Sequence, residues 1–551
     1  MPSRRGWLAL ALGAVCLCAA AIPFSFSSAA SSANENENSQ TLDLALPGPF
    51  NGCSFLSQDA TPTSNAILDL ILPSAFITEP NGVLEGEDGP ISSAELTSLS
   101  PETVRYTIAP KMRWSNGVAF TGEDLVDWWN EARTLASVDS DGYRAIKSLV
   151  VSKNHLSVTA VFATPYADWD LLFRDIEPPG TSEGCAVSNL LTEPTLGPYD
   201  VTSATPDRLV LNMNSAWPLD TNRFGRIVIT DSQDLPSASS VNFADYSMTV
   251  NRTTVVTLSN RPTLSSKIAS SSNIEELTFS PTAATTSLLA VREALSWSIE
   301  RQSLIDTLFG AVTYSPSIAA SAIFSQGQTD YPGGTGSNPV GQTTTTTTPT
   351  ATNTLNDCVS CALSILRSSG FVRTSAGWES GAGEKLSVRL GVGPSALDHA
   401  VALLVKADWS KIGVPSTLVN EASEIGAAEA SAFGRVDVAV FARPTTTTPA
   451  YAARSWAGPA YPDTYPSGVR TPDLTTLFDQ ARAIFNPVTA SATWLKLDQT
   501  IMTDFWVRPL FTAPSLTIWS TPLSMVANSF TVAGFVDQLP TWSRVPTTAT
   551  T

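Results

Sequence analysis

The chain has 551 residues, more than one hydrophobic core usually organises, so two or three lobes are expected. Its apolar content of 43% is typical of a globular protein, and its formal net charge is −18. Because phosphate binding requires clustered Lys and Arg, this acidic balance argues against nucleic acid as a partner and against a basic membrane-binding surface.

Residues 1–30 predict an export segment, either a signal peptide or an N-terminal membrane anchor. Two arginines precede an apolar run over residues 7–26, and small residues follow it. Cys16 and Cys18 lie inside this run, but neither follows a small residue, so a lipid-attachment box is poor. Lipoprotein, secreted and membrane-tethered forms all stay open, each in the cell envelope or a periplasm-like space. Residues 31–40 are polar and predict a flexible tether.

Apolar periodicity predicts the elements that follow. In chain order they are a strand over 41–47, a helix over 64–76, strands over 103–110, 156–166, 208–214 and 226–231, one continuous helix over 288–310, helices over 361–371 and 397–413, and a strand over 414–420. Strands that alternate with helices in this way predict an α/β fold.

Residues 112–120, MRWSNGVAF, predict a hairpin, because Asn116-Gly117 supplies positive φ at low cost. Thr121 then caps a helix, with Asp124 in the capping-box position. The apolar face of this helix comprises Leu125, Trp128, Trp129 and Ala132. The segment is interpreted as architecture and not as a catalytic motif.

Four cysteines follow the export segment, and an even number in an oxidising compartment predicts two disulfides. Cys358 and Cys361 are close enough in sequence to pair locally, which leaves Cys53 to pair with Cys185. A redox or metal role for the CxxC pair is the alternative. The chain has only 2 histidines, which argues against zinc, so no metal and no cofactor are expected.

Three segments rich in Thr and Pro interrupt the pattern, at 340–354, 443–450 and 546–551. They contain few apolar residues to bury, so the first is expected to be a loose insertion and the last a disordered tail. O-linked glycosylation and plain disorder both remain open for these segments.

The sequence contains no recognisable catalytic motif. His155 and His399 lie in no metal or nucleophile motif. The carboxylate pairs at 123–124 and 275–276 are adjacent in sequence, which suits solvated faces better than acid/base catalysis. The chain is therefore not expected to be an enzyme, and a secreted hydrolase is the alternative.

A series of segments, in order, resembles the landmarks of the family 5 extracellular solute-binding proteins, which are peptide receptors of ABC importers. They include VRYTIAPKMRWSNGVAFTGEDLVDWW, LGPYDVTS, VREALSWSIERQSLIDTLFG, CALSILRSSGF and VDVAVFARP. Each match alone is weak, but their order is specific. The resemblance implies a type II periplasmic-binding-protein fold, an α/β fold with two hinged lobes plus an extra subdomain, and a monomer.

The resemblance also implies domain boundaries. Lobe I is expected to comprise 41–90, 185–280 and 504–545, with the extra subdomain over 91–184 and lobe II over 281–503.

Within the family, LILPSAF, DGYRAIKSL and VFATPYADWDLLFRDIEP resemble the LpqW-like actinobacterial branch. That branch is tied to phosphatidylinositol mannoside and lipoarabinomannan synthesis, so the resemblance implies a role in envelope glycolipid synthesis. A dipeptide or oligopeptide receptor for an ABC importer is the alternative, and a purely structural envelope protein is a third. The ligand would be a small molecule, a peptide or a glycolipid headgroup, and the partner an ABC permease or an envelope glycosyltransferase.

The pocket motif departs from the peptide-binding pattern. Ala442-Arg443 stand where those relatives have G-W, and Thr residues replace the acids that follow. The site is interpreted as having gained a cation and lost its anion, which favours an anionic or neutral ligand. A vestigial pocket and a solvated arginine at a loop edge are the alternatives. The candidate ligand-binding residues are Ser54-Phe55, Phe76, Tyr199, Phe441, Arg443, Thr445 and Tyr451.

Overall fold

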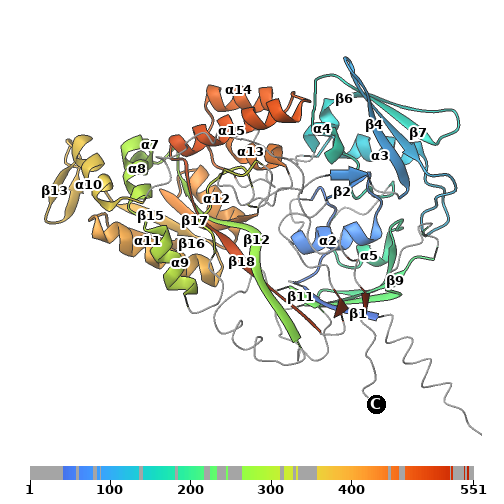
Figure 1. Ribbon diagram of the computed structural model, residues 1–551, viewed down its shortest axis with the longest axis horizontal. Helices are drawn as coiled ribbons and strands as arrows, with labels where there is room; N and C mark the ends of the chain where they lie inside the picture. The colour runs from blue at the N-terminus through green and yellow to red at the C-terminus, as the bar shows by residue number, and fades with distance from the viewer. Residues whose placement is uncertain are drawn as a thin grey trace, which may run out of the picture. The chain divides into compact units, whose positions relative to one another are not determined.

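Figure 1 shows the computed structural model of the protein. It describes residues 41–46, 48–57, 61–78, 84–86, 89–135, 140–179, 184–215, 217, 224–231, 243–245, 264–310, 316–324, 326, 330–332, 357–444, 448–457, 466–520, 523–524, 539 and 543–544. The predicted export segment, tether, Thr/Pro-rich insertion and C-terminal tail lie outside these residues.

Both strands and helices are distributed along the chain. The strands are β1 (Thr41–Leu46), β2 (Phe76–Thr78), β3 (Leu84–Gly86), β4 (Ile91–Leu99), β5 (Glu102–Ile108), β6 (Ile146–Val151), β7 (Ser157–Phe162), β8 (Tyr199–Thr205), β9 (Arg208–Met213), β10 (Arg226–Asp231), β11 (Phe243–Asp245), β12 (Leu264–Phe279), β13 (Val372–Thr374), β14 (Gly377–Glu379), β15 (Val388–Val392), β16 (Ser416–Asn420), β17 (Val438–Pro444), β18 (Val507–Ser520), β19 (Leu523–Ser524) and β20 (Ser543–Arg544). The helices are α2 (Pro62–Ile71), α3 (Gly122–Ala132), α4 (Ser140–Ala145), α5 (Asn189–Thr192), α7 (Ala284–Ser287), α8 (Leu289–Trp297), α9 (Arg301–Phe309), α10 (Val359–Ser368), α11 (Ala396–Lys411), α12 (Glu424–Ala432), α13 (Pro449–Ala457), α14 (Pro472–Ala481) and α15 (Pro487–Thr503), with a 3₁₀ turn at Trp169–Leu171. Over the part of the chain described, none of these helices is long and apolar enough to cross a membrane.

A mixed sheet organises most of the described chain. Its strand order is β16-β15-β17-β12-β18-β11-β1-β10-β9-β8, and β15 runs parallel to both β16 and β17. The long strands β12 and β18 pair antiparallel along most of their length, so they connect the two halves of this sheet (Figure 1). A separate antiparallel sheet has the order β4-β5-β7-β6. The predicted α/β class is therefore confirmed.

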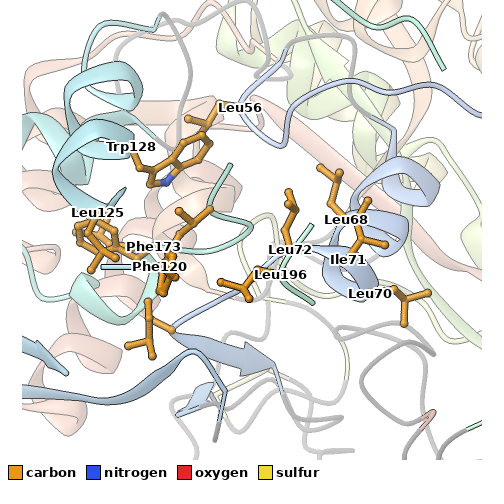
Figure 2. Close-up of a cluster of buried hydrophobic side chains, with 14 of the residues drawn as sticks. Leu56, Leu68, Leu70, Ile71, Leu72, Phe120, Leu125, Trp128, Phe173 and Leu196 are labelled. Atoms are coloured by element: carbon orange, nitrogen blue, oxygen red, sulfur yellow. The ribbon is translucent and has the colours of Figure 1, made fainter. Parts of the chain in front are cut away.

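Helices cover the sheets and form several distinct cores. One cluster joins α2 and α3 to β1, β5, β7 and β9; Figure 2 shows part of it, with Leu68 of α2, Leu72 directly after that helix and Trp128 of α3. A second cluster lies among α8 to α11 and β15, β17 and β18, and a third among α13, α14 and α15. This separation agrees with the expectation from chain length that one core would not suffice.

The hairpin and cap predicted around residues 112–124 are present. Gly117 has φ +85°, and its N–H donates to the Trp114 carbonyl at 2.8 Å. Asp124 closes the capping box by accepting from the Thr121 N–H at 2.7 Å. Asp124 also accepts from the Trp114 indole at 2.9 Å and is buried, so the prediction that it is solvated was wrong. Its neighbour Glu123 is exposed, as predicted.

The helix predicted as continuous over 288–310 is two helices, α8 and α9, so that prediction was wrong. The chain leaves helical geometry at Glu300, with φ −86° and ψ 78°. Distant carboxylates bind the amides at the break: Asp408 accepts from the Glu300 N–H at 3.3 Å and Asp357 from the Arg301 N–H at 2.9 Å. These long-range acceptors stabilise a helix start that apolar periodicity does not reveal.

Both predicted disulfides are present, Cys53–Cys185 and Cys358–Cys361. The first joins segments 132 residues apart, and the Gly52 N–H donates to the Cys185 carbonyl at 3.2 Å beside it. The second spans the start of α10, where Cys358 is the N-cap residue.

Candidate functional site

The candidate site lies at the carboxyl ends of three parallel strands. β15, β16 and β17 end at Val392, Asn420 and Pro444. α11 and α12 begin just beyond this edge, capped by Ser395 and Ser423, whose hydroxyls accept amide hydrogen bonds at 3.0 and 2.9 Å. In open α/β sheets, ligands bind beyond the carboxyl ends of the strands, where helix N-termini also point.

Arg443 of β17 is buried at this edge. Its side chain is 3% exposed, and its Nε lies 3.0 Å from Oε1 of Glu276, which is 0% exposed. The guanidinium also donates to the Ala322 carbonyl at 2.8 Å. The alternative of a solvated arginine at a loop edge is therefore wrong. A carboxylate inside the protein balances the charge of Arg443.

The pKa of Glu276 is raised, because burial outweighs the attraction and hydrogen bond of Arg443. The pair is thus held together in a poorly solvated interior. Removing either partner would leave the other buried without compensation.

Three further carboxyl groups converge beside this pair. A Cβ placed on Gly393 would lie 2.5 Å from both Asp398 Oδ2 and Glu424 Oε2, so these two oxygens meet over the same backbone position. The Ala442 N–H donates to Glu424 Oε2 at 3.3 Å, and Glu275 is the register partner of Ala442 on β12. The interpretation that this region had lost its anions is therefore wrong.

Burial and the neighbouring acids raise the pKa of two of these carboxyl groups, Glu275 and Glu424. Burial, followed by the charges of Asp398 and Glu424, raises the pKa of Glu275 well above its ordinary value. Burial, followed by the charge of Asp398, raises the pKa of Glu424 to about 8, although the Ala442 amide opposes this. Over the described ranges, no cluster of His, Cys, Asp and Glu has an arrangement that could hold a metal ion.

The other candidate residues near this edge have different surroundings. Phe441 is 1% exposed and packs in a small apolar cluster with alanines of α12. Tyr451 is half-buried on α13, and Thr445 lies outside the described residues. Phe441 and Arg443 are thus placed by one strand, two residues apart.

Ser54 and Phe55 lie near the first disulfide. Ser54, Cys53 and Leu72 are among the residues that line a cavity of about 420 Å³, counted with its open mouth. The Arg174 guanidinium lies 5.0 Å from the centre of the Phe55 ring. Ser54 therefore borders a cavity at α2, whereas Phe55 contacts Arg174.

Phe76 and Tyr199 belong to strands of the first half of the chain. Phe76 of β2 contacts Trp169 edge to face, with ring centres 5.6 Å apart. Tyr199 of β8 is 3% exposed, and its hydroxyl donates to the Phe224 carbonyl at 3.0 Å. Tyr199 is thus held in the interior by this hydrogen bond.

Glu275 and Glu276 are site residues that the sequence analysis missed. They were predicted on a solvated face, yet both are 0% exposed, because β12 is flanked by β17 and β18. A usable signal was present: Ile274, Leu277 and Phe279 surround them as in a buried strand. A buried guanidinium also requires an anion nearby.

Comparison with known proteins identifies the family. Residues 93–466, more than half of the chain, match the model of the bacterial extracellular solute-binding proteins, family 5, middle region. The chain belongs to this family. Family 5 proteins are non-enzymatic solute-binding proteins of the ABC-importer type, so the prediction that the chain is not an enzyme is confirmed. Membership also agrees with an extracytoplasmic location.

The structural comparison supports the fold. The periplasmic EDTA-binding protein EppA superposes with a TM-score of 0.78 over 92% of this chain and 96% of its own, at 19% identity. The predicted type II periplasmic-binding-protein fold is therefore confirmed. At this identity, the likeness concerns the fold alone.

Two curated relatives match shorter stretches. The chain is 34% identical over 130 residues to the probable monoacyl phosphatidylinositol tetramannoside-binding protein LpqW of Mycobacterium tuberculosis, covering 22% of this chain and 20% of the relative. It is 29% identical over 192 residues to the oligopeptide-binding protein OppA of Mycobacterium bovis, covering 31% and 32%. The matches thus span about a fifth and a third of these relatives' lengths.

Proposed function

We propose that this family 5 protein is an extracytoplasmic receptor for the mannosylated headgroup of a phosphatidylinositol glycolipid. The observation that carries the proposal is the 34% identity to LpqW, the higher of the two identities to curated relatives. Its partner is then an ABC permease or an envelope glycosyltransferase that receives or senses the bound headgroup.

The chemistry of the strand edge is compatible with such a ligand. Carboxyl groups accept hydrogen bonds from sugar hydroxyls when ionised and also donate one when protonated. Glu424 is the partly exposed carboxyl group there, and Glu276 already balances the charge of Arg443. The edge thus favours the neutral mannosyl part of the headgroup and disfavours its phosphate.

We retain the division into lobe I, extra subdomain and lobe II as part of this proposal. The apolar cores support the separation of lobe I from lobe II: one gathers residues from 42–229 and residue 539, and two others gather residues from 277–511. The extra subdomain shares the first core and is marked only by its own sheet, β4-β5-β7-β6. Ligand binding would then close lobe II toward lobe I about β12 and β18, the strands that join the halves of the sheet.

An oligopeptide receptor is the second candidate. The match to OppA extends over 192 residues, against 130 for LpqW. Carboxyl groups at the strand edge would also suit the α-ammonium group of a peptide.

Calorimetric titration separates the two candidates. Deacylated phosphatidylinositol tetramannoside should bind, whereas tetra-alanine should give no heat of binding. Glu424→Gln should weaken headgroup binding by about tenfold through the loss of one hydrogen bond from the carboxyl group. Glu429→Gln, which alters another partly exposed glutamate of α12, is the matched control and should bind like wild type. Binding of tetra-alanine without binding of the headgroup would replace the first candidate by the second.

A further inference from the structure

Three carboxyl groups at the strand edge, two of them buried and one partly exposed, are not matched by a cation. Among the described residues, no ion pair includes Glu275, Asp398 or Glu424. Glu275 is 0% exposed, and neither of its carboxyl oxygens has a hydrogen-bond partner. Asp398 is also 0% exposed, and its Oδ1 has no hydrogen-bond partner. Its Oδ2 accepts a hydrogen bond from the Ser395 N–H at 2.8 Å.

The charged neighbours of Glu275 do not supply a cation that could neutralise it. Its neighbour on β12 is Glu276, whose charge is engaged by Arg443 of β17 at 3.0 Å. On the other side of β12, the register partner of Glu275 is the apolar Phe511 of β18. The groups that face Glu275 from α11 and α12 are the acids Asp398 and Glu424.

Three carboxylates in such a site cannot all stay ionised, because like charges and burial both penalise the charged form. Glu275 and Asp398 are 0% exposed, so bulk water does not solvate their negative charge. A proton shared between neighbouring carboxyl groups satisfies the oxygens that otherwise lack partners. A proton, unlike a metal ion or an organic cation, can neutralise these groups without a cavity large enough to hold it.

We propose that Glu275, Asp398 and Glu424 share protons as one pH-sensitive site, which holds the end of β17 in place when protonated and loosens it when deprotonated. The inference goes beyond the proposed ligand and does not depend on its identity.

The connection to β17 passes through Glu424. This residue is the first of α12, it is the partly exposed member of the three, and it accepts from the Ala442 N–H at 3.3 Å. When the site loses its protons, repulsion from Asp398 and Glu275 favours rotation of Glu424 toward water. The Ala442 amide, adjacent to Arg443, then loses its acceptor.

The direction of the pH effect follows from the raised pKa values. An unfolded glutamate titrates near 4.5, whereas the pKa of Glu424 is raised to about 8 by burial and then by the charge of Asp398. Between these values the folded protein holds more protons than the unfolded chain, so its stability falls as pH rises. The contribution is fully present below the unfolded value and is lost as pH rises through the folded one.

Proton release on unfolding tests the proposal directly. In a pH-stat at pH 6.5, Glu275→Gln should release about one proton fewer than wild type when urea unfolds the protein. Its unfolding midpoint should also decline less between pH 5 and pH 8.5. Glu429→Gln should match wild type in both measurements. Equal proton release and equal pH dependence in wild type and Glu275→Gln would overturn the proposal.

A second variant keeps the test decisive if Glu275→Gln does not fold. Glu424→Gln alters the partly exposed member of the site and retains an oxygen that accepts from Ala442. Hydrogen exchange of the peptide covering 438–444, corrected for the intrinsic rate, should rise with pH in wild type by up to about tenfold per pH unit and level off above about pH 8, where Glu424 has lost its proton, whereas it should stay constant in Glu424→Gln. Corrected exchange in wild type that does not change between pH 5.5 and pH 9 would refute the switch.

Discussion

Replacing Arg443 by Met removes one member of a buried ion pair while keeping much of its volume. Glu276, 0% exposed, then loses the cation 3.0 Å away, and the Ala322 carbonyl loses its donor. Breaking such a pair from one side typically costs about 3–5 kcal/mol, a large part of a total stability of about 5–15 kcal/mol. The thermal midpoint of the unit that contains β17 should fall by roughly 6–20 °C.

The assay is differential scanning calorimetry of wild type, Arg443→Met and the double variant Arg443→Met/Glu276→Gln. The double variant should recover most of the loss, because no unpaired charge remains. The loss in Arg443→Met should also shrink at pH 5, because burial raises the pKa of Glu276 and the carboxyl group then accepts a proton.

Arg435→Met, which alters an arginine with a 52% exposed side chain, is the matched control and should change little. An unchanged thermal midpoint in Arg443→Met, or a double variant less stable than the single one, would refute the conclusion that Arg443 and Glu276 form a buried ion pair in which each charge needs the other.

Three further outcomes are expected. Cys53→Ser/Cys185→Ser should lose about 5 kcal/mol by the loop-entropy estimate for its separation of 132 residues, and urea unfolding monitored by fluorescence would check it. Gly117→Val should lose about 1 kcal/mol by backbone strain at φ +85°, with ligand binding unchanged; a shifted ligand preference at an unchanged melting temperature would contradict this. Asp357→Asn should lose about 3–5 kcal/mol, because two buried arginines share this carboxylate, and wild-type stability in scanning calorimetry would show the network to be unimportant.

Local sequence signals predicted the local structure well. Asn116-Gly117 and the Thr121 cap act over a few residues, so their geometry follows from turn and capping chemistry alone. The helices over 361–371 and 397–413 were found for the same reason, since each carries its own apolar stripe and a glycine at its end. The family resemblance added the fold, which periodicity alone does not specify.

The candidate site depends on contacts between distant segments, so the sequence predicted it only in part. Arg443 was singled out correctly as unusual, but its partner lies 167 residues away on β12. Glu275 looks like a solvent-facing residue until the order of the sheet places β17 and β18 on either side of it. The break between α8 and α9 has the same cause, because the carboxylates that stabilise it come from residues 357 and 408.

The most direct test of the proposed function is the identity of the molecule that the protein carries. Native mass spectrometry of the protein purified from its own cell envelope, followed by release and fragmentation of the bound species, measures this without a choice of ligand. We expect a phosphatidylinositol bearing mannose residues. A bound peptide would contradict it.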